Sequence, residues 1–187
     1  DSKECSDDPL FVELVQALHE INPSANSAYY LGLLKDKVGD SKSALLYYEE
    51  SLTLEVDNYK KASILYKIAV KFKTRGLKTK SRQYARKALK FQPSMGKAYL
   101  LIANLYASSA NDCGETQFEK RSIYWLAAQQ ARKAANVDPS TKKTALSMAK
   151  SYEGRAPTRT DIFTEGKEGQ TIIFSCWIKD KITVPKL

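Results

Sequence analysis

Two stretches of this chain follow one pattern: residues 31–54, LGLLKDKVGDSKSALLYYEESLTL, and residues 68–91, IAVKFKTRGLKTKSRQYARKALKF. Placing Leu31 opposite Ile68 also aligns Gly39 with Gly76, Ala44 with Ser81, Tyr48 with Ala85 and Leu54 with Phe91. A glycine is typical of the residue that ends a helix, and small residues opposite large ones are typical of two helices that cross closely. Each stretch is therefore predicted to form a pair of antiparallel helices within residues 25–93.

A third copy begins at Gly96. Its first helix is expected to place Tyr99, Ile102, Ala103 and Tyr106 at the repeated positions, and its second helix Ala127, Ala131, Ala134, Val137 and Pro139. Extra residues around positions 108–121 separate these two helices. Such an insertion must bulge from the end of the helix pair, because the stack of helices would otherwise be disturbed.

The segments on either side of the repeats are predicted as follows. Residues 9–21 form a helix whose apolar positions, at the spacing of one buried stripe, are Phe11, Leu14, Val15, Leu18 and Ile21. This half repeat, in residues 1–24, covers the end of the array in residues 25–154. Ser140 and Thr141 cap a last helix with an inward face of Ala145, Met148, Ala149 and Tyr152.

The last segment, residues 155–187, changes character. Residues 171–178 are β-branched and aromatic, with one face made of Ile172, Phe174, Cys176 and Ile178. A turn at residues 179–181 leads into a second strand at 182–184. Because an isolated hairpin is barely stable in water, this hairpin is expected to pack on the last helices.

The repeated residues resemble the tetratricopeptide repeat (TPR) family, whose unit of about 34 residues has the signature W-x2-L-G-x2-Y…A-x3-F…P. The resemblance implies an all-α, right-handed array of about three repeats plus capping helices, here with a short C-terminal β-hairpin. More specifically, residues 106–110, Cys113-Gly114, residues 118–121, Tyr124-Trp125 and residues 176–178 resemble the exported TPR proteins of the Bacteroidota cell envelope. This implies a periplasmic location, and another repeat is expected to precede residue 1 where longer chains exist.

In this family the first helix of each repeat lines a concave groove that binds polypeptides. The equivalent partner-binding positions here are Asn26, Tyr29, Leu33, Tyr66, Val70, Lys97, Leu100 and Asn104. Aromatic side chains bury a large area at low entropic cost, and lysines speed the encounter with an acidic partner. A protein or peptide with acidic and apolar groups is therefore the expected partner, unless the C-terminal tail fills the groove. Tyr29 and Leu33 replace the Lys and Asn that clamp a C-terminal carboxylate in the family, so that mode is not expected.

Charge is distributed unevenly along the chain. Residues 1–57 carry twelve acids and four bases, whereas residues 58–111 carry thirteen bases and no acid. The basic patch is assigned to Lys67, Lys71, Lys73, Lys78, Arg82 and Arg86. It suggests three alternative partners: an acidic protein, an anionic envelope surface, or nucleic acid. Nucleic acid is disfavoured because few aromatic rings are left for base stacking. The polarity of the chain also allows self-assembly as a structural subunit.

No enzyme chemistry is expected from the sequence. The chain has one histidine, His19, with no nucleophile or metal ligands near it in sequence, and no phosphate-binding or HExxH motif. No cofactor or metal is expected, and no run approaches the roughly 18 apolar residues of a membrane span. Cys113 lies in the insertion and Cys176 in the tail, the two features foreign to a basic repeat. They form either a disulfide, which export would favour, or two free thiols; Cys5 would then be the odd cysteine.

Overall fold

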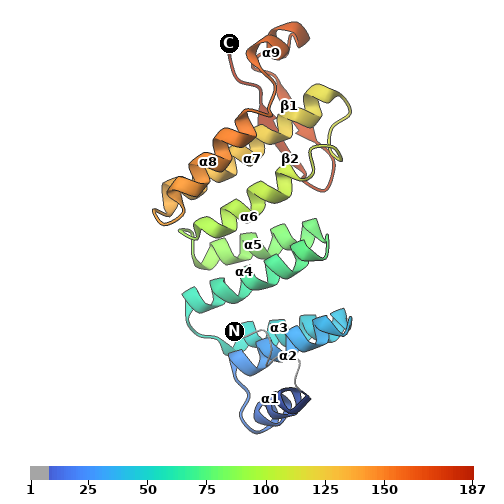
Figure 1. The fold of residues 1–187 in the computed structure, drawn as a ribbon, viewed down its shortest axis with the longest axis vertical. Helices are drawn as coiled ribbons and strands as arrows, with labels where there is room; N and C mark the ends of the chain where they lie inside the picture. Colours follow the sequence, from blue (N-terminus) through green and yellow to red (C-terminus); the bar gives the residue numbers. More distant parts are fainter. Residues whose placement is uncertain (1–8) are drawn as a thin grey trace. The chain divides into compact units, whose positions relative to one another are not determined.

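The computed structural model describes residues 9–187, so Cys5 and most of the predicted N-terminal tail lie outside the described residues. These residues form nine α-helices followed by a two-stranded antiparallel hairpin, which confirms the predicted helical repeat array with a C-terminal hairpin (Figure 1). The chain divides into two compact units, residues 1–68 and 69–187, with the boundary inside α4 (Asn58–Thr74).

The first unit contains α1 (Pro9–Ile21), α2 (Ala25–Lys37), α3 (Ser41–Leu54) and the first turns of α4. α2 begins at a capping box in which Ser24 and Ser27 bond to each other's backbone amides. Gly39 has a φ of 85°, a left-handed conformation that suits glycine and lets the chain turn directly into α3. Leu31 and Ala44 are buried where α2 and α3 pack.

The predicted buried stripe of α1 is wrong, although the helix itself is confirmed. Val15 is buried, but Leu14, Leu18 and Ile21 are 59%, 56% and 84% exposed. In the described part of the chain, α1 packs chiefly against α2, where the Phe11 and Tyr30 rings meet edge to face at 6.0 Å. One neighbouring helix covers only a narrow line of α1, so helical spacing of apolar residues did not ensure their burial.

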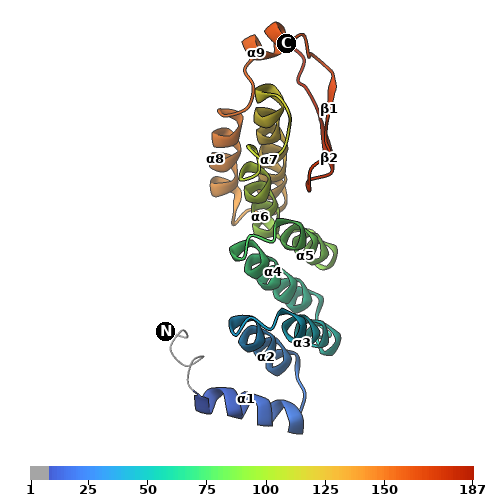
Figure 2. The ribbon, with the colours of Figure 1, turned by 90° about the vertical axis from the view of Figure 1, so that its right-hand side faces the viewer.

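The second unit continues from α4 through α5 (Lys78–Phe91), α6 (Gly96–Ala107), α7 (Gln117–Val137), α8 (Lys142–Glu153) and α9 (Arg159–Glu165). α6, α7 and α8 pack side by side (Figure 2). Their core includes Ile102, Leu105 and Ile123, all nearly inaccessible to solvent. Ile68 in the first unit and Ala85 in the second are fully buried, as their aligned positions predict.

The insertion and the last cap differ in detail from the predictions. Residues 108–116 form the turn between α6 and α7, whereas residues 117–121 extend α7 by more than a turn, capped by Thr116 and Glu119. Thr141 is the N-cap of α8, but its hydroxyl does not accept from the helix and donates instead to the carbonyl of Asp138. The inward face of α8 is confirmed, since Ala145, Ala149 and Tyr152 are buried.

The hairpin pairs β1 (Thr171–Phe174) with β2 (Asp180–Thr183), with Ile172 opposite Ile182. It lies along α7, which confirms the predicted packing on the last helices (Figure 2). The first strand is shorter than predicted, because the chain turns from residue 175 onward and reaches a positive φ of 42° at Lys179. Cys176 and Trp177, predicted to continue the strand, instead contact the insertion, through the disulfide to Cys113 and the hydrogen bond from the indole to Ser109.

Candidate functional site

In the first unit, the predicted partner-binding residues centre on Tyr29. Its ring lies 5.8 Å from that of Tyr48 and 6.0 Å from that of Tyr30, measured between centroids. The ammonium group of Lys67, predicted as part of the basic patch, lies 5.1 Å from the Tyr29 centroid, a cation–π distance. Burial, with a smaller contribution from Tyr30, raises the pKa of Tyr29 to about 12. The site is therefore an aromatic ring that is packed between two tyrosines and has a cation over it.

The other predicted residues of this unit flank that ring. Leu33 on α2 is half-buried and Asn26 is exposed. Tyr66, on α4 with Lys67, is also half-buried, and burial raises its pKa. Tyr29 and Tyr66 are thus partly accessible and partly packed. Each ring can therefore gain contacts with a partner without leaving the core of the unit.

In the second unit, three predicted residues lie on α6 and one on α4. Leu100 is half-buried against Ala134, Ala135 and Ala145, so α7 and α8 both support it. Asn104 hydrogen bonds to the Tyr152 hydroxyl of α8, and burial raises the pKa of Tyr152 despite this bond.

Lys97 is exposed and Val70 on α4 is half-buried. The start of α6 is fixed by Gly96, whose amide donates to a carboxylate oxygen of Asp138 at 3.1 Å. A Cβ at Gly96 would collide with Thr141 and Asp138, so only glycine allows α6 to approach the α7–α8 turn this closely.

The residues of the predicted basic patch differ in the contacts that they make. Lys67 contacts Tyr29 in the first unit, whereas Lys71, Lys73, Lys78, Arg82 and Arg86 belong to the second unit. Lys71 and Lys73 are exposed on α4. Lys78, Arg82 and Arg86, however, contact the insertion and the C-terminal tail, which gives these three cations intramolecular roles that the sequence analysis did not predict.

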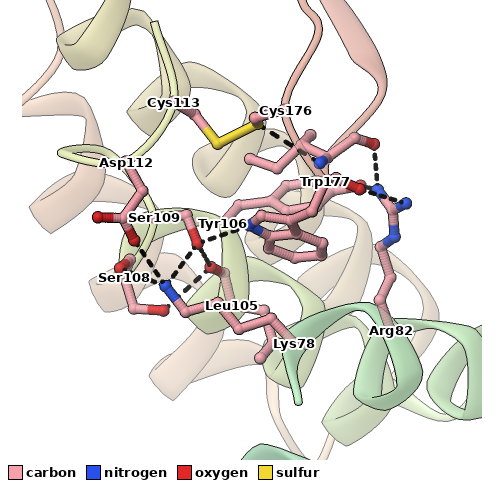
Figure 3. Close-up of a disulfide and its surroundings, with 11 residues drawn as sticks. Lys78, Arg82, Leu105, Tyr106, Ser108, Ser109, Asp112, Cys113, Cys176 and Trp177 are labelled. Carbon is pink, nitrogen blue, oxygen red and sulfur yellow. Dashed lines mark hydrogen bonds and ion pairs between the residues drawn. A yellow bond between two sulfur atoms is a disulfide. The ribbon is translucent and has the colours of Figure 1, made fainter. Parts of the chain in front are cut away.

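The strongest of these contacts surround Trp177 (Figure 3). The Arg82 guanidinium donates to the backbone carbonyls of Trp177, at 3.1 Å, and Ile178. It also lies over two rings, 5.0 Å from the centroid of Trp177 and 5.8 Å from that of Tyr106. The Trp177 indole N–H donates to the Ser109 hydroxyl at 3.1 Å. Arg82 on α5 thus holds the turn of the hairpin by charge-assisted hydrogen bonds and stacking together.

The insertion is connected to the same place. Cys113 and Cys176 are joined by a disulfide with Cα atoms 5.6 Å apart (Figure 3). The Lys78 ammonium donates to the carbonyl of Ser108 and the hydroxyl of Ser109, and it pairs with Asp112 at 3.1 Å. We call Lys78, Arg82, Ser109, Cys113, Cys176 and Trp177 the tail anchor. It links α5, the insertion and the hairpin, segments that are far apart in sequence.

Sequence reasoning singled out both cysteines of the tail anchor but missed its cation contacts. The sequence did contain one signal: the insertion carries a cysteine, and the tail carries Cys-Trp. Both segments are additions to the repeat units, and such additions must pack against some part of the array. Nothing in α5 distinguishes Arg82 from its exposed neighbours except that Ser81 and Ala85, on either side, are buried.

His19 has partners that the sequence analysis did not predict. Its Nδ1 lies 2.9 Å from the Ser27 hydroxyl and its Nε2 lies 3.2 Å from a Glu50 carboxylate oxygen. This Ser–His–Glu set resembles a hydrolytic triad, but Ser27 is 4% exposed and its hydroxyl also bonds to the Ser24 carbonyl and accepts from the Ser24 amide. Ser27 therefore serves the capping box of α2, and His19 ties α1 to α2 and α3.

Two features are absent from residues 9–187, a metal-binding cluster and a membrane-spanning helix. No three His, Cys, Asp or Glu side chains are grouped so that they could hold a metal ion. None of the helices in this range has the length and apolar character needed to cross a bilayer.

No model of a known protein family matches the chain. The chain is 32% identical over 107 residues to the Photosystem I assembly protein Ycf3 of Cyanophora paradoxa, a TPR-containing protein. The match covers 52% of this chain and 62% of Ycf3, so the chain spans less than two thirds of that relative. The comparison supports the helical repeat type, whereas the resemblance to exported Bacteroidota proteins stays a prediction.

Proposed function

We propose that the chain is a noncatalytic protein–protein interaction scaffold that binds a polypeptide partner through the first helices of its repeats. The observation that carries this proposal is the contact between Tyr29 and Lys67, in which an ammonium group lies 5.1 Å from the centroid of a half-buried ring. An apolar group of the partner that packs on this ring buries aromatic surface, and a carboxylate of the partner can form an ion pair with Lys67. The partner would therefore be a protein or peptide segment with both apolar and acidic residues.

The second unit supplies an independent set of contacts, made of Lys97, Leu100 and Asn104 on α6. Leu100 is supported from behind by the alanines of α7 and α8, so its exposed part is preorganised. Preorganised side chains lose little entropy on binding, which favours affinity. We propose that this set binds the same class of partner, with Lys97 and Asn104 as polar contacts around an apolar centre.

The relative supports the class of function but not the partner. Ycf3 of Cyanophora paradoxa is named a photosystem I assembly protein. A role in assembly belongs to the same class of function as an interaction scaffold.

We further propose that the chain works in the cell envelope, in the periplasm. Support comes from the Cys113–Cys176 disulfide, because such bonds persist in oxidising compartments and are rare in the cytosol. Alkylation of free thiols in intact cells, followed by mass measurement of the isolated chain, tests this. Modification of Cys113 and Cys176 without prior reduction would contradict the envelope location.

The scaffold proposal is tested by placing a photo-crosslinking amino acid at Tyr66 in one variant and at Tyr59 in another. Both residues lie on α4, but Tyr59 is 68% exposed and is not one of the proposed contacts. In cells that make the protein, crosslinks to a defined polypeptide are expected from position 66 and not from position 59. Equal crosslinking at both positions, or none at 66, would contradict the proposal.

The second unit has its own matched pair. Leu100→Ala removes the proposed contact on α6, whereas Leu146→Ala removes a more exposed leucine on α8 that is not one of the proposed contacts. Once the crosslinked partner has been identified, its binding to the purified chain can be measured. Leu100→Ala is expected to weaken this binding about tenfold, because one good apolar contact is lost. If Leu146→Ala weakens binding as much, the effect is one of folding and the α6 surface is not the binding site.

A further inference from the structure

α5 carries an exceptional density of positive charge. Its fourteen residues contain six cations and no acid, Lys78, Lys80, Arg82, Arg86, Lys87 and Lys90. Arg82, Arg86 and Lys90 are spaced four residues apart, so they form one row with a step of about 6 Å along the helix. The helix buries its other face through Ser81, Tyr84, Ala85 and Ala88. The cationic row lies on the opposite side, where Arg86 and Lys90 are exposed and Arg82 is half-buried against the hairpin.

This row borders a hollow. Thr79, Arg82, Gln83, Arg86, Lys87 and Lys90 line it, and its volume is about 420 Å³. Four of the six lining side chains are cations, and the other two are a hydroxyl and an amide. A hollow of this composition offers many hydrogen-bond donors and four positive charges, so it suits an anionic, hydrogen-bonding ligand.

Three of the four lining cations are held in place by their neighbours. Arg86 donates to the Tyr106 hydroxyl at 3.3 Å and lies 3.8 Å from an Asp180 carboxylate oxygen. Lys87 lies 4.9 Å from the centroid of the Tyr84 ring. Arg82 is fixed by the tail anchor, as described above. These contacts limit the side-chain entropy that a ligand would otherwise have to remove on binding.

The charge of the hollow is not balanced from within the described chain. Against the four lining cations, the one carboxylate found in an ion pair with any of them is that of Asp180, bound to Arg86. Like charges at a spacing of four residues on a helix destabilise that helix. An anionic partner would relieve this repulsion, which makes the surface electrostatically complementary to an acidic segment.

We propose that the outward face of α5 binds an acidic polypeptide segment, with carboxylates that pair with Arg86, Lys87 and Lys90. Gln83 and Thr79 can bond to backbone or side-chain amides of such a segment. The residues that line the hollow include no aromatic ring, so they offer no platform for the bases of single-stranded nucleic acid. This surface uses none of the residues of the proposed scaffold contacts, so either proposal can fail without the other.

The probe is a fluorescein-labelled helical peptide with Glu at every fourth position, compared with the same peptide carrying Gln. Fluorescence anisotropy of the purified full chain is expected to show binding of the Glu peptide that weakens as salt rises, because exposed charges are screened beyond about 10 Å at 0.1 M salt. Lys87→Gln/Lys90→Gln is expected to weaken binding about fivefold, the effect of removing two exposed charge contacts.

The matched control is Lys142→Gln/Lys143→Gln, which removes the same charge from the exposed start of α8. Equal weakening by both double variants would overturn the proposal, since net charge alone would explain binding. Tighter binding of an oligonucleotide of equal charge, lost in Lys87→Gln/Lys90→Gln, would overturn it in favour of nucleic acid. Sedimentation that shows self-association lost in the same variant, without peptide binding, would assign the surface to a second copy of the chain.

Discussion

Gly32 of α2 lies directly against the ring of Tyr48 of α3. A Cβ added at Gly32 would be 2.5 Å from Cδ1 of Tyr48 and 3.2 Å from the carbonyl oxygen of Ala44. Both distances are shorter than ordinary van der Waals contact, so the two helices can approach this closely only because position 32 has no side chain. The aligned repeats replace this small–large pair by two alanines, and all four residues are fully buried: Ala69, Ala85, Ala103 and Ala131.

The first prediction concerns this pair. Gly32→Ala should lower the free energy of unfolding by about 1–2 kcal/mol, because overpacking of a core costs about 1–3 kcal/mol and alanine returns up to about 1 kcal/mol of helix propensity. In a Tyr48→Ala background the sign should reverse, since the methyl group then fills space vacated by the ring. Urea unfolding followed by circular dichroism of the four proteins measures the cycle. A Gly32→Ala effect of the same sign in both backgrounds would contradict the packing described here.

The second prediction concerns the disulfide between Cys113 and Cys176, which are 63 residues apart. Replacing both by serine should destabilise the protein by about 2–4 kcal/mol, because the cross-link restricts the unfolded chain. Guanidinium unfolding of wild type with and without a reducing agent should show the same difference. Cys5→Ser is the control and should behave as wild type. If the reducing agent also changes the unfolding of the double serine variant, the loss of stability on reduction does not come from this disulfide.

The third prediction concerns Arg82. Arg82→Met keeps an unbranched apolar stem but removes the hydrogen bonds of Arg82 to the carbonyls of Trp177 and Ile178, at a cost of about 1–3 kcal/mol. In a Trp125→Phe background, Trp177 becomes the one fluorescent indole, and its emission should shift to longer wavelength as the turn of the hairpin opens to water. Lys90→Met on the same helix removes an exposed cation instead. Identical emission from the two variants would show that Arg82 does not hold the tail.

The parts of the fold that sequence could predict are those set by short-range, repeated packing. Gly39 and Gly76 end their helices with a positive φ, and the aligned small residues are buried, because a pair of helices meets at positions fixed by helical periodicity. Burial of α1 could not be predicted in the same way. Its apolar spacing indicates a helix, but how much of Leu14 or Ile21 is covered depends on what packs outside it.

The tail anchor shows the other limit. Arg82 and Trp177 are 95 residues apart, and no periodic pattern connects them. From the sequence, Arg82, Arg86 and Lys90 are equivalent cations on one helical row; only the position of the hairpin distinguishes the first two from the third. For the same reason the first strand was predicted too long. The alternation of apolar residues continues through Cys176 and Ile178, but Cys176 is bonded to the insertion and Ile178 to Arg82, where the chain turns.

The fourth prediction concerns alkaline pH and Tyr29. Burial raises the pKa of Tyr29 to about 12, above its value of about 10 in an unfolded chain. A group whose pKa is higher in the folded state contributes stability that is complete below the unfolded pKa and lost as pH rises through the folded one. Stability should therefore fall between pH 10 and pH 12, partly because ionisation of Tyr29 is easier in the unfolded chain.

In the Tyr29→Phe variant this part of the loss of stability should be absent, because all other titrating groups are the same as in the wild type. Thermal unfolding midpoints of the two proteins across this range measure the difference, with tyrosinate absorbance as a second readout. If the midpoints of the two proteins fall in parallel with pH, the Tyr29 ring is not desolvated. That result would contradict the packing described for the aromatic site proposed to bind the partner.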